Sequence, residues 1–231
     1  MNASTTITLL KKYAADISPV VPIDLNSPTV CQLDFTAHNA LLLDKDLRNT
    51  AAFAQLVYDL LAKQNATVGI GGYQENRVIY NRSTHFDSQE DKRSVHLGVD
   101  IWMPAGTLVS APLDARVHSF QDNNHFGDYG PTIILEHELE GNTFYTLYGH
   151  LTRTSLPALW VGKPIAKGET FAQIGPFPEN GDWPPHLHFQ VMTDMLGQAG
   201  DFPGVCTPGQ QEYYAQICLN PNLLLQSVYL D

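Results

Sequence analysis

Apolar and polar positions alternate through segment 185–191, which reads Pro-His-Leu-His-Phe-Gln-Val. Side chains of a β-strand point alternately to opposite faces, so His186 and His188 share one face while the leucine, phenylalanine and valine share the other. The pattern predicts a strand that buries one face in a core and presents two imidazoles on the opposite face.

A second alternating segment, 96–101, reads His-Leu-Gly-Val-Asp-Ile and places His96, Gly98 and Asp100 on one face. On a regular strand, positions four apart lie about 13 Å from each other at roughly 3.3 Å per residue. His96 and Asp100 would then be too far apart to bind one ion. We therefore expect the segment to bend, and Gly98 is the residue best able to allow it.

Most of the chain after residue 69 has the texture of a β protein, because short β-branched and aromatic runs are separated by Gly, Pro, Asn and Asp. The predicted strands include 77–80, 107–110, 132–136 and 143–148. Segments 104–111 and 162–169 each place glycine turns around a short strand, as in hairpins that close a sandwich or barrel-like sheet. The predicted fold class is mainly β, with the β domain spanning 69–196.

The flanking regions differ from this texture. Segment 50–64 has apolar residues at helical spacing after a possible Asn49 cap, and a weaker helix is predicted over 6–16. Residues 1–68 therefore form a predicted helix-containing extension. Residues 197–231 are rich in Pro and Gly and predict an irregular wrap, with a terminal helix around 221–228.

Composition narrows the function classes. The net charge is -11 over 231 residues and no Lys/Arg cluster exceeds a pair, which argues against a nucleic-acid partner. No segment approaches the roughly 18 apolar residues of a membrane-spanning helix, so we expect no membrane insertion.

Residues 1–12 do not have the pattern of a signal peptide, and three cysteines suit a reducing compartment. We expect a cytoplasmic protein; the alternative is the periplasm or cell envelope, reached by a non-classical route. The oligomeric state stays open.

The histidines and Asp100 suit a catalytic zinc site. Such a site has three nitrogen, sulfur or carboxylate ligands and leaves the fourth position to water. His96, Asp100 and His188 fit that count, while His186 could bind the metal too or reach the substrate. His150 follows an aromatic strand, whose end can point a side chain into a cleft.

Three motifs in order carry a family resemblance: His-Leu-Gly-Val-Asp at 96–100, Tyr-Gly-His-Leu at 148–151, and His-Leu-His-Phe at 186–189. Together they resemble the lysostaphin-type (LytM-like) zinc metallopeptidases, which include many murein endopeptidases, over residues 94–192. The resemblance implies a compact antiparallel β core with the metal in a groove. It implies one zinc ion held by His96, Asp100 and His188, with His150 and His186 as catalytic residues.

The implied reaction is endopeptidase hydrolysis of a peptide bond by a zinc-bound water, most of all in peptidoglycan-derived peptides. One of the two catalytic histidines would take the proton and the other would stabilise the oxyanion, and sequence does not divide these roles. The expected partner is a peptide or muropeptide, and Trp183, just before the active-site strand, is a candidate substrate-binding residue.

Two departures from the family bear on the substrate. Family members commonly have a Ser/Thr/Gly-rich approach before the His-x-His motif and a Glu after its Phe, whereas this chain has Asn-Gly-Asp-Trp-Pro-Pro at 180–185 and Gln190. This version resembles variants fused to cytoplasmic aminotransferase-type enzymes. Two alternatives follow: a non-hydrolytic, metal-stabilised peptide-binding or regulatory domain, or a peptidase held latent by its N-terminal extension or by segment 71–86.

The other histidines have no patterned partners and are predicted to be surface or hydrogen-bonded strand residues. They are His38, His85, His118, His125 and His137. The tyrosines of the β segments are predicted to pack in the core or across strands.

Overall fold

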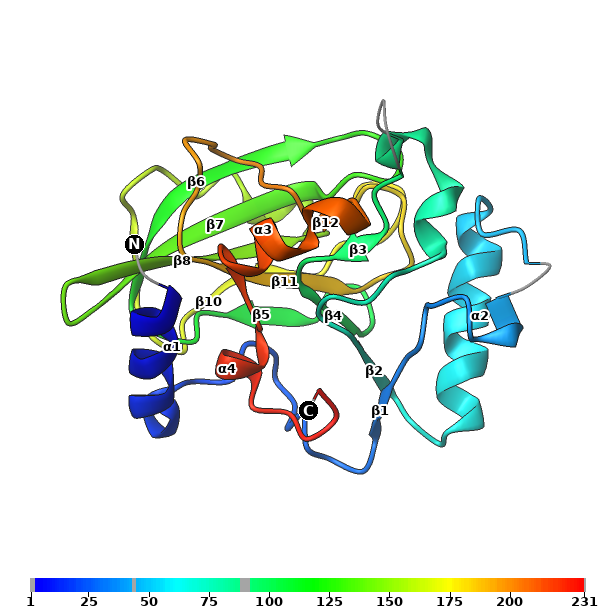
Figure 1. Cartoon of the computed structure of the whole chain (residues 1–231), viewed down its shortest axis with the longest axis horizontal. Helices are drawn as coiled ribbons and strands as arrows, with labels where there is room; N and C mark the ends of the chain where they lie inside the picture. The colour runs from blue at the N-terminus through cyan, green and yellow to red at the C-terminus, as the bar shows by residue number, and fades with distance from the viewer. Residues whose placement is uncertain (1–2, 43–44, 88–91, 231) are drawn as a thin grey trace.

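The computed structural model describes residues 3–42, 45–87 and 92–230, and its centre is one large β-sheet (Figure 1). The sheet has nine strands, eight of them in the order β1-β2-β4-β11-β8-β7-β6-β9, with β13 paired to β11. Its strands are β1 (Val30–Gln32), β2 (Val68–Gly71), β4 (Val99–Trp102), β6 (Ala115–Asn123), β7 (Gly130–Leu139), β8 (Asn142–Gly149), β9 (Pro164–Ile165), β11 (Leu187–Met192) and β13 (Cys218–Leu219). All pairs are antiparallel except β1–β2. The predicted mainly β, antiparallel fold is confirmed.

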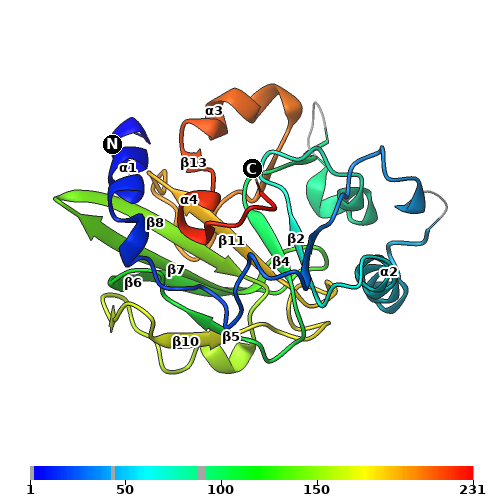
Figure 2. The same cartoon turned by 90° about the horizontal axis from the view of Figure 1, so that it is seen from below.

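Two small sheets complete the β structure. Strands β5 (Leu108–Ser110) and β10 (Thr170–Gln173) pair on one side of the large sheet, opposite helices α1 and α4 (Figure 2). Strands β3 (Val95–His96) and β12 (Val205–Cys206) pair beside the metal-site strands described below. The glycine-flanked segments 104–111 and 162–169 do contain short strands, β5 and β9, but these pair with β10 and β6 and not with each other.

The long strands form where β-branched and aromatic residues alternate with polar ones, and their apolar faces build the core. Ile133, Leu135, Tyr148, Phe189 and Val191 are all fully buried. Each such side chain contributes about 1.5–3 kcal/mol by leaving water. The histidine-bearing strand β11 therefore lies between two paired neighbours, β4 and β8, at the centre of a packed sheet.

The predicted helices of the N-terminal region are present. Helix α2 (Thr50–Lys63) begins where expected, with the Asn49 side chain accepting from the Ala52 amide at 3.1 Å. The helix predicted over 6–16 is α1 (Ala3–Lys12), followed by a separate 3-10 turn. The buried apolar face of α2, which includes Phe53, packs in a second core cluster with Trp102. Among the described residues, no helix has the length and apolar character needed to span a bilayer.

The remaining helical segments are short. They are the 3-10 turns Ala14–Asp16, Ala40–Leu42, Ile79–Arg82, Thr84–Phe86, Arg153–Ser155 and Pro208–Gln210, and the helices α3 (Gln211–Ala215) and α4 (Asn222–Leu225). The strand predicted over 77–80 is wrong, because residues 79 and 80 belong to the 3-10 turn Ile79–Arg82. The reason is tertiary: Arg77, Ile79 and Tyr80 are all buried and so do not alternate between two faces.

Parts of both flanking regions belong to the large sheet. Strand β1 of the N-terminal region extends it at one edge, and β13 of the C-terminal region pairs with β11. Helix α4 lies within the range predicted for a terminal helix. The division into 1–68, 69–196 and 197–231 remains a prediction about sequence organisation, but the sheet spans all three ranges.

Candidate metal centre and active-site cavity

The metal-site residues come together through strand pairing. Strands β4 and β11 are antiparallel neighbours in a register that sets His188 directly opposite Asp100. Opposed residues of such a pair bring their side chains within a few ångströms of each other. Two strands separated widely in sequence thus supply one imidazole and one carboxylate at the same place.

His96 reaches the same place because the chain bends after it. Strand β3 ends at His96 and β4 begins at Val99, so the regular extension is interrupted at Leu97 and Gly98. A Cβ on Gly98 would lie 2.7 Å from the His188 imidazole and 2.7 Å from the Phe189 carbonyl oxygen. The expected bend is therefore present, and glycine is needed there because a strand and an imidazole lie directly against it.

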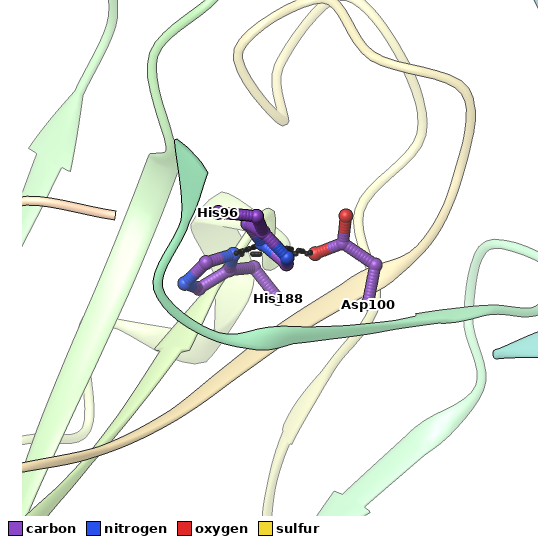
Figure 3. Close-up of side chains that lie close together, drawn as sticks. All are labelled: His96, Asp100 and His188. Atoms are coloured by element: carbon purple, nitrogen blue, oxygen red, sulfur yellow. Dashed lines mark hydrogen bonds and ion pairs between the residues drawn. The ribbon is translucent and has the colours of Figure 1, made fainter. Parts of the chain in front are cut away.

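Three donor atoms of these residues face one point (Figure 3). His96 Nε2 lies 2.9 Å from His188 Nδ1 and 3.3 Å from Asp100 Oδ1, and His188 Nδ1 lies 3.2 Å from Asp100 Oδ1. Ligand atoms about 2.0–2.1 Å from a tetrahedral zinc ion are roughly 3.3 Å apart. The donor set and its spacing fit zinc. In the described part of the chain, no other three or more His, Cys, Asp or Glu residues bring their ligand atoms together in this way.

The outer nitrogen of each imidazole ligand has its own partner. His96 Nδ1 donates to the Gly72 carbonyl at 3.1 Å, and His188 Nε2 donates to Gln190 Oε1 at 3.0 Å. These bonds leave a lone pair on the nitrogen that faces the metal position. Gln190, a departure from the family pattern, thus serves as the acceptor that orients His188.

Arg77 is a buried partner of the site that the sequence did not reveal. Its guanidinium is fully buried and forms ion pairs with Asp100 Oδ2 and, at 2.5 Å, with Glu75 Oε2. The pairing occupies one oxygen of Asp100 and leaves Oδ1 for a metal. Burial opposes ionisation of Asp100, but His96 and Arg77 hold its pKa well below the ordinary value. The carboxylate is therefore charged and ready to bind a cation.

The two predicted catalytic histidines border the metal site. His150 Nδ1 donates to the Asn180 carbonyl at 2.8 Å, and His186 Nδ1 donates to the Pro184 carbonyl at 2.7 Å. Their ring centroids are 4.2 Å apart, and His186 Nε2 lies 3.8 Å from Asp100 Oδ1. Burial lowers the pKa of His186 to about 4 and that of His150 well below its ordinary value. Both rings are neutral at pH 7, with Nε2 free to accept a proton.

Local structure fixes both rings. His150 follows the end of β8 in the left-handed region, at φ 62°, with its amide bonded to the Tyr129 carbonyl. Non-glycine residues adopt this conformation at a cost and are concentrated at functional sites. Trp102 stacks on the His186 ring at 4.1 Å with an interplanar angle of 18°.

A cavity of about 140 Å³ lies over the metal site. Trp183 lines it, as do His150, His186 and the two ligands Asp100 and His188. The other lining residues are Ile79, Tyr80, His85, Phe86, Arg93, Trp102, Gly127, Asp128, Tyr129, Gln198, Asp201, Phe202, Pro203, Gly204 and Val205. No described residue of 1–68 lines the cavity, so the described part of the extension does not fill it.

Most of these walls have no signal in the sequence. Tyr80, Phe86 and Tyr129 line the cavity, although aromatics on β-type segments are expected to pack in the core, and His85 lines it although it has no patterned partner. His137, in contrast, is a buried strand histidine bonded to the Asp114 carbonyl and the Thr146 hydroxyl, as predicted. Residues that line a cavity do not recur at a regular spacing in the sequence. The one available signal is that some of them lie in a segment just before a metal-ligand motif.

Comparison with protein families finds a match over the region that contains the site. Residues 94–200 match the model of Peptidase family M23. They form an M23 domain. The motif-based resemblance to lysostaphin-type peptidases is thereby confirmed, and the domain contains all five predicted metal-binding and catalytic residues.

Several solved structures resemble this chain. A zinc-containing peptidase from Vibrio cholerae is 25% identical with a TM-score of 0.33, covering 42% of this chain and 27% of that one. A putative M23 peptidase from Pseudomonas aeruginosa is 21% identical with a TM-score of 0.37, covering 56% and 43%. The catalytic domain of lysostaphin from Staphylococcus simulans is 25% identical with a TM-score of 0.40, covering 58% and 81%. The aligned region therefore spans less than half of the first two chains. No curated protein matches.

Proposed function

We propose that this protein is a zinc-dependent peptidase whose single metal ion is held by His96, Asp100 and His188. The observation that carries the proposal is the set of three buried donor atoms, 2.9–3.3 Å apart, inside an M23 domain. Two neutral histidines beside the set supply the remaining groups that peptide hydrolysis needs.

Zinc, when bound, polarises a water molecule and lowers its pKa toward about 7. The chain's own residues handle the proton. His150 and His186 each present an Nε2 lone pair toward the site, because Nδ1–H is tied to a backbone carbonyl. One ring accepts the proton of the attacking water, and a protonated ring then donates to the oxyanion or the leaving amine.

We further propose peptidoglycan-derived peptides as the substrate class, on the resemblance of the three motifs to those of murein endopeptidases. Trp183 is the proposed substrate contact, since it lines the cavity and lies in edge contact with the His150 ring at 6.1 Å between centroids. A reducing compartment such as the cytoplasm is our proposed location, supported by three free, buried cysteines.

The test is cleavage of defined muropeptides by the zinc-loaded chain, followed by mass spectrometry of the products. His188→Ala and Asp100→Ala should lose zinc and activity together, whereas His186→Ala and His150→Ala should retain zinc and lose turnover. His38→Ala, an exposed histidine outside the site, is the matched control and should retain both.

Cleavage that survives chelation, or that persists at full rate in His186→Ala, would contradict the proposal. Tight binding of a muropeptide without any cleavage would instead support the non-hydrolytic alternative. Zinc content, measured on the same samples, separates a lost metal site from a lost catalytic group.

A further inference from the structure

We infer that the active site is a dead-end pocket that takes in the free end of a peptide, so that the cut falls close to a chain terminus. The inference rests on the proposed peptidase function and narrows it. It is carried by where the cavity opens and how its walls are joined.

The cavity has one rim. The lining residues that reach solvent are His85, Arg93, Asp128, Gln198, Asp201 and Pro203, and all the others are buried. The rim residues lie close together: His85 Nε2 is 3.8 Å from Asp128 Oδ1, and Arg93 donates to the His85 carbonyl. Asp201 adds to the effect of burial in raising the pKa of Asp128, so it too lies nearby. Among the described residues, the lining side chains that reach solvent are therefore confined to this one cluster, and we take it as the entrance.

The metal site lies at the closed end. Asp100, His186 and His188 are each no more than 3% exposed, and none of them belongs to the rim. Behind them the cavity ends on Trp102 and Trp183, which pack against helix α2 in the second core cluster. A peptide that reaches the metal site from the rim meets a wall and has no described exit.

The walls are fastened to one another. The Ser83 hydroxyl donates to the Phe126 carbonyl at 2.9 Å, which joins segment 79–86 to the turn before Asp128. The Gly127 amide donates to the Gly181 carbonyl at 2.9 Å, which joins that turn to the loop that carries Trp183. On the other side, the Leu97 amide donates to the Gly204 carbonyl at 2.8 Å, beside the β3–β12 pair. A chain lying across the site would have to separate these contacts.

The experiment is a series of extensions on one substrate. The zinc-loaded full chain is given a linear muropeptide stem, the same stem extended with glycines at the amino end, at the carboxyl end or at both ends, and the stem closed head to tail. We expect one single-end extension to be tolerated. The other single-end extension, the double extension and the cyclic form should each lower cleavage at the original bond by roughly two orders of magnitude.

Similar cleavage of all five substrates would overturn the inference while leaving the proposed function intact. Absence of cleavage of every substrate by a zinc-loaded chain would reject the proposed function, and this inference with it. The wild-type series requires no variant, so its outcome does not depend on the folding of a mutant.

A variant adds a second readout. Phe86→Ala removes a buried aromatic side chain from the wall beside the rim. We expect it to raise the rate on the doubly extended stem, relative to the plain stem, about tenfold. Tyr213→Ala, an exposed aromatic outside the cavity, is the control and should leave the ratio unchanged. An unchanged ratio in folded Phe86→Ala protein would count against closed walls.

Discussion

The metal site and the walls above it are built in different ways. Two metal ligands lie on paired strands whose register sets His188 opposite Asp100, and a bend in the chain brings in His96 from the end of β3. The walls come from turns at 79–86 and from segment 198–205, whose shape depends on contacts with distant parts of the chain. The chemistry thus has a strong local signature, while substrate selection is set by tertiary contacts with almost none.

Arg77 joins the two parts, because it lies just before the wall turns and pairs with the ligand Asp100. Arg77→Met should leave the buried Asp100 and the partly buried Glu75 as uncompensated charges and lower the free energy of unfolding by about 3–5 kcal/mol. We expect zinc affinity to fall about 10–100-fold, since Asp100 loses the partner that orients it. Chelator competition and urea unfolding measure the two effects.

Arg77→Lys is the matched control for charge. It should recover part of the stability but not the two-sided pairing with Asp100 and Glu75, because an ammonium lacks the planar fork of a guanidinium. If folded Arg77→Met binds zinc with wild-type affinity, the metal site does not depend on the wall segment that begins at Arg77. The metal site and the walls would then be structurally independent, which contradicts the link that we propose.

Gly98 tests the part of the site that the sequence could predict. In Gly98→Ala, the new Cβ would approach both a ligand imidazole and a strand carbonyl to 2.7 Å. We expect a loss of about 1–3 kcal/mol in stability and at least a tenfold loss of zinc affinity. Gly209→Ala, where a Cβ would have only one neighbour at 3.9 Å, should change neither quantity. Unchanged zinc affinity in Gly98→Ala would refute the close-approach argument.

Features that depend on periodicity could be predicted from the sequence. Alternation around His186 and His188 predicts β11, helical spacing predicts α2, and the three motifs indicate the five site residues. The strand predicted over 77–80 is absent because Arg77 is drawn to Asp100, a contact that no local pattern encodes. Likewise, β13 and β12 depend on pairing with strands far away in the chain, so the local pattern of the C-terminal region indicates only irregular structure.

His137 is a buried histidine with a structural role, and it can be compared with the buried histidines of the active site. Burial lowers its pKa to about 4, whereas an unfolded histidine titrates near 6.5. The unfolded chain therefore binds a proton first as the pH falls, so this group's contribution is constant above about pH 6.5 and is lost between pH 6.5 and about 4. The loss amounts to about 3 kcal/mol at most.

Urea unfolding of the metal-free chain at pH 7 and pH 4.5 measures this dependence. His137→Gln should be less stable than wild type at pH 7 but should lose less stability on acidification. Equal acid sensitivity in the two proteins would show that other groups dominate the pH dependence of the free energy of unfolding. The buried active-site histidines would then be the first candidates for the same comparison.

Thr50 provides the mildest test of whether the N-terminal region restrains the enzyme or supports it. Its hydroxyl donates to the Asp182 carbonyl at 3.0 Å and accepts from Arg82 at 2.7 Å, and the Arg82 guanidinium lies 4.6 Å from the Trp183 ring. Helix α2 is therefore tied to the loop that carries a wall of the cavity.

Thr50→Ala should cost about 1 kcal/mol of stability and lower kcat/KM a few-fold, because Trp183 is held less firmly. Thr50→Ser retains the hydroxyl and should behave like wild type. Latency predicts the opposite sign, so a higher kcat/KM in Thr50→Ala would favour an extension that restrains the site over one that supports it.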